Sequence, residues 1–237
     1  MDIEKIIING DITVITKDIP EHLPETSLKP DPGEVESVSF RLTDGNMAQF
    51  DITDRGEGWI RFDSRQCLGK SAWNKNGSTE GDILESDLQK YLDTKIYALI
   101  PTWLAEMIME TKRKNTNGEE YRTWLFAPDA SEVFGADEGM YETRYQRLPY
   151  YEKAYNRIKA DIKDEEYPVN WWTASASSGN AAGAVFVATS GMSAGITASG
   201  VLGVPVCFRI NAADLGGLIR EALNSGGTVR RIQEVKL

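Results

Sequence analysis

A stretch without any charged side chain, residues 173–208, constrains the fold more than any other feature of this 237-residue chain. It follows the pair Trp171-Trp172, ends at Arg209, and consists mainly of Gly, Ala, Ser and Thr. Because the whole chain carries a net charge of −10, so long an uncharged stretch favours one of two structures. It is either a set of tightly packed strands or a polar surface used for recognition.

The patterns along the rest of the chain predict a mixture of strands and helices. We expect strands at 184–188, 193–198 and 204–210, a hairpin at 3–16, a β-meander at 35–62 and an edge strand within 228–237. We expect helices that begin near Ser86, Pro101, Asp129 and Asn211, and a short helix or helical turn at 150–162. The capping box at Ser86 would involve Gln89, and the apolar stripe of the last helix would be Leu215, Leu218, Ile219 and Leu223. Residues 112–120 are predicted to be a polar loop.

Prolines mark the best candidate for a domain boundary. Four of them lie within residues 18–33 among acidic residues. We therefore divide the chain into an N-terminal β arm and linker at 1–33, a main domain at 34–211, and a C-terminal helix with an edge strand at 212–237.

Composition argues against several kinds of partner. Nucleic acid is disfavoured because phosphate binding needs clustered Lys and Arg. An anionic membrane surface is disfavoured by the acidic charge, and no apolar run is long enough for a membrane helix. The first five residues do not resemble a signal peptide. Cys67 and Cys207 are too few for a disulfide framework, so a reduced cytoplasmic setting is expected, with a virion-associated protein as the other localisation; a single bridge between them is left open.

The common catalytic and cofactor-binding patterns are absent from the sequence. It has no phosphate loop, dinucleotide fingerprint or HExxH motif, and its one histidine, His22, lies in the proline-rich linker. Clusters of carboxylates are expected to be solvated surface. Asp137 and Glu138 could bind calcium, although they lack EF-hand spacing. We predict no catalytic residue, metal or cofactor, and keep a carboxylate- or calcium-dependent enzyme as the alternative.

The tryptophan pair has two interpretations. Neighbours on a strand point to opposite faces, so one ring would face the core and the other would face outward as a stacking platform for a sugar or a peptide. The small polar residues that follow serve either strand packing or recognition. On the second interpretation, the predicted ligand-binding residues are Trp171, Trp172, Ser175, Ser177 and Asn180.

Several motifs occur in an order that resembles a domain of unknown function common in Firmicutes and their phages, with a Trp-Trp-Leu-Arg-Ser hallmark. The matching segments, within residues 35–211, are 86–93, Glu132-Val133-Phe134-Gly135, Asn156-Arg157-Ile158-Lys159, Trp171-Trp172, Ala182 to Val185 with Gly191, and 203–208. Two arginines of the family pattern are missing, because Thr173-Ala174-Ser175 and Pro205-Val206 stand in their places. If those arginines serve an anion or an ion pair, this chain lacks it.

That family is similar to C-type lectin-like domains, which include formylglycine-generating enzymes and variable receptor-binding proteins of phages. The resemblance implies an α+β fold: a lectin-like mixed core of short strands and two or three helices, with an N-terminal β arm and a C-terminal helix. The copper-binding cysteine pair of the formylglycine enzymes would have to be Cys67 and Cys207, whose surroundings in the sequence do not match.

We therefore expect a non-enzymatic binding or structural module, encoded by a phage or prophage, with an unknown protein or glycan ligand. A virion or assembly component is a further alternative. In that case the proline-rich arm and the last helix would mediate homo-oligomers.

Overall fold

The computed structural model describes residues 4–8, 11–15, 35–80, 83–115, 117–137 and 139–231. The chain forms two compact units, residues 1–30 and 31–237. In the first unit, β1 (Glu4–Ile8) pairs antiparallel with β2 (Asp11–Ile15), which confirms the predicted hairpin. The linker residues 18–33, including His22, lie outside the described residues.

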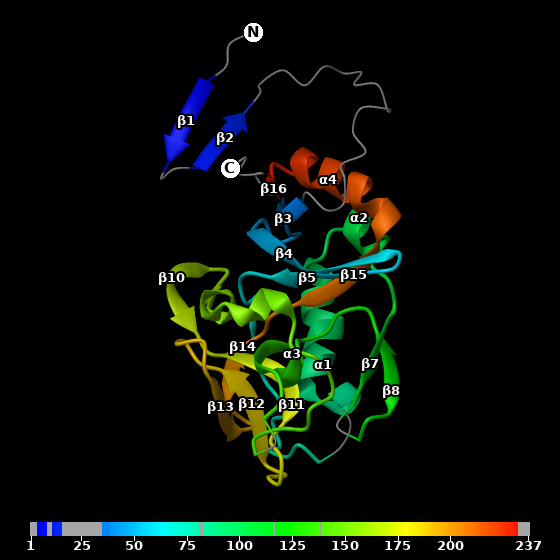
Figure 1. The fold of residues 1–237 in the computed structure, drawn as a ribbon, viewed down its shortest axis with the longest axis vertical. Coiled ribbons are helices and arrows are strands. Elements are labelled where there is room, and N and C mark those ends of the chain that lie inside the picture. The colour runs from blue at the N-terminus through cyan, green and yellow to red at the C-terminus, as the bar shows by residue number, and fades with distance from the viewer. Residues whose placement is uncertain are drawn as a thin grey trace. The chain divides into compact units, whose positions relative to one another are not determined.

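The second unit contains two five-stranded sheets, of which the first has the order β15-β5-β4-β3-β16 and is antiparallel throughout (Figure 1). Its strands are β3 (Val35–Arg41), β4 (Met47–Gly56), β5 (Trp59–Ser64), β15 (Cys207–Asn211) and β16 (Val229–Arg231). The predicted meander is confirmed. Gly45 forms its first turn with a φ of 90°, a conformation that favours glycine, and the rings of Phe40 and Phe50 stack 4.9 Å apart on the buried face.

The second sheet has the order β13-β12-β11-β14-β6, and four of its five strands come wholly or largely from the uncharged stretch. Its strands are β6 (Lys70–Ala72), β11 (Trp171–Ala176), β12 (Gly183–Val187), β13 (Ser193–Thr197) and β14 (Val201–Gly203). Small residues allow close packing here, because a Cβ atom on Gly203 would lie 2.6 Å from Cys67 Sγ.

The helices are short. They are α1 (Asp87–Tyr91), α2 (Thr102–Ala105), α3 (Ala130–Phe134) and α4 (Leu215–Asn224), a π-helix at Leu92–Ile96, and 3-10 turns at Ile83–Glu85, Tyr97–Leu99, Pro149–Glu152, Ala154–Arg157 and Ala212–Asp214. Helical structure begins where the sequence predicts it, after Ser86, Pro101, Asp129 and Asn211. The helix expected at 150–162 is shorter, because residues 159–161 form β9 (Lys159–Asp161), which pairs with β10 (Asp164–Val169).

The capping box predicted at Ser86 forms only in part. Ser86 Oγ accepts a hydrogen bond from the Gln89 backbone N–H at 3.0 Å. The Gln89 amide does not return to the helix start, but donates to Thr123 Oγ1 and to the Leu125 carbonyl oxygen. Gln89 is buried, so its side chain must satisfy these tertiary partners instead of the helix end.

The polar loop predicted at 112–120 is too long, because residues 112–114 and 120 lie in strands and the connection between them is shorter. These residues belong to a hairpin of β7 (Thr111–Lys114) and β8 (Glu120–Thr123), in which every second residue is buried. One of the buried positions holds Arg113, whose charge is neutralised by Glu132 of α3. Because a charged residue occupies a core-facing position, the period of two does not show as an apolar pattern.

One hydrophobic core joins both sheets and the helices, and includes Phe62, Phe208, Leu88 and Trp172. Helix α4 packs on β3 with Leu215 and Leu218 buried, whereas Leu223 of the predicted stripe is 49% exposed. Strands with a few short helices make the fold α+β, as predicted. The lectin-like arrangement stays a prediction. Among the described residues, no helix is long and apolar enough to cross a membrane.

Candidate functional site

Both tryptophans of the predicted ligand platform are buried. Trp171 and Trp172 are each 0% exposed, and their indole N–H groups donate to the carbonyl oxygens of Arg157 and Ser71, each at 2.8 Å. The expectation that one ring faces outward is wrong, because β11 is the central strand of its sheet and is covered on both faces. Neither ring presents a face to a ligand.

The other predicted ligand-binding residues divide into two groups. Ser175 is buried, and its hydroxyl donates to Asp129 Oδ2 at 3.0 Å. Ser177 and Asn180 lie together in the connection from β11 to β12, where both would be within 3 Å of a Cβ atom on Gly183. Ligand binding by this turn stays a prediction.

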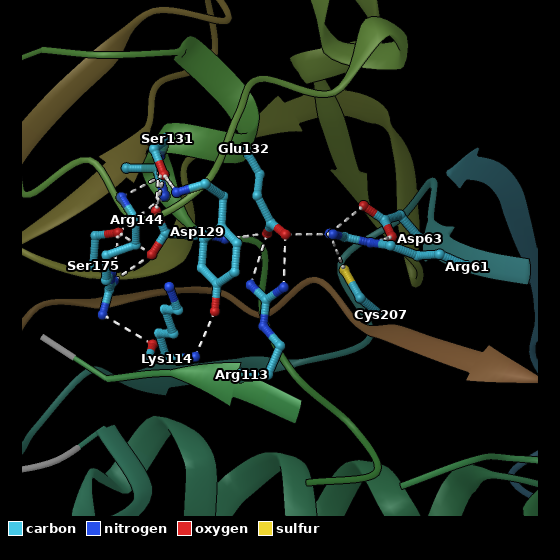
Figure 2. Close-up of polar contacts among 12 residues, drawn as sticks. Arg61, Asp63, Arg113, Lys114, Asp129, Ser131, Glu132, Arg144, Ser175 and Cys207 are labelled. Atoms are coloured by element: carbon cyan, nitrogen blue, oxygen red, sulfur yellow. Dashed lines mark hydrogen bonds and ion pairs between the residues drawn. The ribbon is translucent and has the colours of Figure 1, made fainter. Parts of the chain in front are cut away.

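Ser175 belongs to a buried network of charged residues that the sequence analysis did not identify (Figure 2). At its centre, Glu132 Oε1 accepts hydrogen bonds from Arg61 Nη1 and Arg113 Nη1, each at 2.6 Å, and Oε2 accepts from Arg113 Nη2 at 2.8 Å. Arg61 Nε donates to Asp63 Oδ1 at 2.7 Å. Both guanidinium groups lie over the ring of Phe126, 5.1 and 4.5 Å from its centroid.

Asp129 organises the second half of this network. It is the N-cap of α3 and accepts hydrogen bonds from the Ser131 backbone N–H and hydroxyl at 2.9 and 2.6 Å. Arg144 pairs with Asp129 and also donates to Ser175 Oγ at 3.0 Å. The two halves are joined because Glu132 Oε2 accepts from the Asp129 backbone N–H at 2.8 Å.

The charges of the network balance. Three arginines (Arg61, Arg113, Arg144) face three carboxylates (Asp63, Asp129, Glu132). Burial alone would raise the pKa of Glu132, but Arg113 and Arg61 hold that pKa far below its ordinary range. All three carboxylates are paired and buried, so the network holds β5, β7 and α3 together.

The burial of the two cysteines can be tested by thiol labelling. Both are free and 0% exposed; burial raises the pKa of Cys67 to about 12, and burial together with Asp63 raises the pKa of Cys207. Because the thiolate is the reactive form, we expect neither thiol to react with Ellman's reagent at pH 8 in the native protein. Both should react after unfolding in urea. Rapid labelling of the native protein would contradict the burial described here.

An open pocket of about 590 Å³ lies between strands β3 and β4 and the turns at 149–158. Four cationic residues line it (Arg55, Arg65, Lys153, Arg230) together with two carboxylates (Glu36, Asp51). The local charge is therefore positive in a chain whose net charge is −10. We call this cavity the arginine pocket.

Asp51 organises the floor of the arginine pocket. It is 3% exposed, and its Oδ2 accepts from Arg65 Nε at 2.9 Å and from the Tyr150 hydroxyl at 2.5 Å. Gln49 Nε2 donates to Asp51 Oδ1 at 3.1 Å. Burial raises the pKa of Tyr150, and the charge of Asp51 raises it further. Arg65 Nη1 has no hydrogen-bond partner among the described residues, so it can bind an incoming ligand.

The rim of the arginine pocket combines an exposed aromatic ring with polar groups. Tyr155 is 65% exposed, and Lys153 Nζ lies 5.9 Å from the centroid of its ring. Asn156 is held by a hydrogen bond of 2.6 Å from Nδ2 to the Tyr150 carbonyl oxygen. On the opposite side, Arg230 pairs with Glu36 at 3.2 Å.

The calcium alternative gains no support from side-chain geometry. Within the part of the chain that the structure describes, no three His, Cys, Asp or Glu residues are grouped so that they could hold a metal ion. Asp137 Oδ1 accepts a hydrogen bond from the Gly139 backbone N–H at 3.2 Å, and Glu138 lies outside the described residues.

The buried network lies in the part of the chain that matches a known family. The domain of unknown function DUF6273 matches residues 61–212, more than half of the chain, so the protein belongs to this family. All six charged members of the network fall inside that span, whereas the arginine pocket also uses residues 35–55 and Arg230. No curated protein and no solved structure shows a significant match. The predicted membership in a domain of unknown function is confirmed, and its distribution among Firmicutes and phages stays a prediction.

The sequence held one clue to the network and none to the pocket. Arg61 lies on the predicted strand that ends at Phe62, and Asp63 follows directly; if the strand is extended by one residue, both lie on one face. Ile60 and Phe62, which alternate with them, are apolar. The sequence therefore predicts that Arg61 and Asp63 face solvent. The pocket residues come from separate segments that only the tertiary fold brings together.

Proposed function

We propose that this protein is a non-enzymatic binding module, and that its ligand is an acidic sugar or an acidic sugar unit of a glycan, bound in the arginine pocket. The observation that carries the proposal is a cluster of fixed cationic groups beside an exposed aromatic ring. Its volume of about 590 Å³ is in the range of small-ligand sites.

The chemistry of the pocket suits a carboxylate on a sugar ring. A guanidinium group matches the planar geometry of a carboxylate, and Arg65 is half-exposed at 45%, with Nε and Nη2 on Asp51 and Nη1 left for a ligand. Tyr155 supplies an aromatic face for the apolar side of a sugar, and its hydroxyl a polar end. Asn156 and Lys153 add hydrogen-bond donors on the same rim.

The pocket is largely formed before a ligand arrives. Asp51 holds Arg65 and Tyr150, and Asn156 is tied to the backbone of Tyr150. Groups that are already ordered lose less entropy on binding, so even a small ligand can bind with useful affinity. The proposal involves neither nucleic acid nor a membrane. An origin in a phage or prophage would fit a receptor-binding role, and the genome neighbourhood tests it.

Calorimetric titration with glucuronate, galacturonate and neutral glucose tests the proposal. We expect heat of binding from at least one uronate, and an affinity for glucose at least about tenfold lower because the charge-assisted hydrogen bonds are lost. Lys153→Gln and Tyr155→Ala should each weaken uronate binding. Both side chains are at the rim, so their loss should leave the fold intact.

Arg122→Gln is the matched control, because Arg122 is an exposed arginine on β8 that pairs with Glu110, and it does not line the pocket. This variant should bind uronates like the wild type. Absence of uronate binding in both the titration and a glycan array of acidic sugars would reject the proposed ligand. Equal binding by Lys153→Gln, Tyr155→Ala and wild type would reject the site.

A further inference from the structure

A second cavity, of about 440 Å³, lies beside the π-helix Leu92–Ile96. It is lined by β6, Lys75 after that strand, α1, the π-helix, Ser199 and the first residue of β14, all within the family span 61–212. Four lysines line it (Lys70, Lys75, Lys90, Lys95), and among the described residues Asp87 is the one carboxylate in the lining. We call this cavity the lysine groove.

The four lysines differ in whether their ammonium groups already have a partner within the protein. Lys70 Nζ pairs with Asp161 at 3.0 Å, and Lys90 Nζ donates to the Glu85 carbonyl oxygen at 2.6 Å. The ammonium groups of Lys75 and Lys95 make no hydrogen bond or ion pair with any residue that the structure describes, and both side chains are exposed. Two cationic groups in the groove are therefore available to a ligand.

Asp87 offsets one of the four positive charges in the lining, and its carboxylate also has a structural role. Asp87 Oδ2 accepts a hydrogen bond from the Lys75 backbone N–H at 2.8 Å, and the Asp87 N–H donates to Asn74 Oδ1 at 2.9 Å. These bonds tie the turn after β6 to the start of α1. They fix the backbone from which Lys75 extends.

The π-helix brings Lys90 and Lys95 to the same side of the helical segment. In a regular α-helix, residues five apart are rotated by about 140°, so Lys90 and Lys95 would point in different directions. The wider turn of a π-helix, with its i to i+5 bonding, reduces that rotation, and both lysines line one groove. Such segments are often found at functional sites.

The tyrosine in the wall of the groove is held in place by a close contact. A Cβ atom on Gly69 would lie 2.4 Å from the Tyr91 hydroxyl oxygen, so the ring is seated against the backbone just before β6. The Tyr91 side of the groove is therefore fixed in position, whereas the lysine side chains are long and flexible. Ammonium groups on long stems can follow phosphate oxygens in several directions, whereas the fixed guanidinium of the arginine pocket suits a planar carboxylate.

We propose that the lysine groove binds a ligand that carries two or more linked phosphate groups. Lysines from both walls converge on the cavity, so adjacent phosphates of one chain can be contacted from both sides. The net charge of −10 disfavours polyanions on most of the remaining surface, and the arginine pocket is the other locally positive site that the test must separate from this one. This site is independent of the arginine pocket.

Titration of the full chain with inorganic tripolyphosphate, followed by calorimetry at low and moderate salt, tests this proposal. We expect saturable binding to one site that weakens as salt is added, because the ion pairs are screened. Lys75→Gln combined with Lys95→Gln should lower the affinity by about tenfold or more, since two charge-assisted contacts are lost. Orthophosphate should bind more weakly than tripolyphosphate.

Lys112→Gln combined with Lys114→Gln is the matched control, since it removes two exposed lysines of β7 and changes the net charge equally. The control should bind tripolyphosphate within about twofold of wild type. Lys153→Gln, in the arginine pocket, should also bind it normally. No binding of tripolyphosphate at millimolar concentration would overturn the proposal, as would equal loss of affinity in the groove and control variants.

Discussion

Glu132→Gln is expected to lower the free energy of unfolding by about 3–5 kcal/mol, the largest effect of any charge substitution considered for this chain. The carboxylate lies between Arg61 and Arg113, and all three side chains are at most 4% exposed. The amide would leave two buried cations with one carboxylate, Asp63, instead of two. Urea denaturation at pH 7, followed by tryptophan fluorescence, measures the change.

The same substitution should alter the dependence of stability on pH. The pKa of Glu132 in the folded protein lies far below its ordinary value, because the arginines outweigh the effect of burial. A depressed pKa contributes stability that is present above the unfolded value of about 4.3 and is lost as pH falls. The difference in stability between wild type and variant should therefore shrink between about pH 5 and pH 3.

Glu120→Gln is the control for this experiment. Glu120 pairs with Lys112 at 3.3 Å, but both side chains are about 60% exposed, so the change in stability should stay within about 1 kcal/mol. If Glu132→Gln were as mild as Glu120→Gln, the buried network would not stabilise the fold in the way described.

Trp172→Ala should also destabilise the protein by about 3–5 kcal/mol. The ring is fully buried and packs edge-on against Phe186, with the ring centroids 6.3 Å apart. Its indole N–H donates to the Ser71 carbonyl oxygen. Truncation removes the apolar contacts and leaves a cavity and an unpaired acceptor. Thermal and urea unfolding would measure the loss.

Trp124→Ala supplies the comparison, because Trp124 is 52% exposed and its loss should change stability by less than about 1 kcal/mol. The result also tests the burial of Trp172 in the core. If Trp172→Ala unfolded like the wild type but lost binding to a ligand, the display interpretation would be correct and the packing interpretation would not.

The predictions from sequence succeeded where the pattern is local. The meander at 35–62, the helix starts at Ser86 and Asp129, and the cap at Asn211 are confirmed, because alternation and capping involve residues within a few positions of one another. They failed where the conformation of a residue depends on a partner that is distant in the sequence. The sequence around Arg113 predicts a loop, because its neutralising partner Glu132 is distant in the sequence. Gln89 has the spacing of a capping residue, but its amide donates to Thr123 and Leu125 in the folded protein.

The candidate sites show the same division. The tryptophan pair is prominent in sequence, yet its central strand is covered on both faces, which no property of the pair itself reveals. The residues of the arginine pocket and the lysine groove have no distinctive pattern in the sequence, and they form a site only because the fold brings them together. Charge type is local, whereas charge clustering is a property of the fold.

The sequence by itself determined the α+β class, most strand and helix starts, and membership in a domain family of unknown function, because these depend on short-range periodicity and on ordered motifs. Only the tertiary structure decided that the uncharged stretch is packed around Trp171 and Trp172, and that three arginines and three carboxylates share one buried site. Whether a side chain is covered, paired or open to solvent depends on which segments the fold brings against it. Those segments lie tens of residues away along the chain.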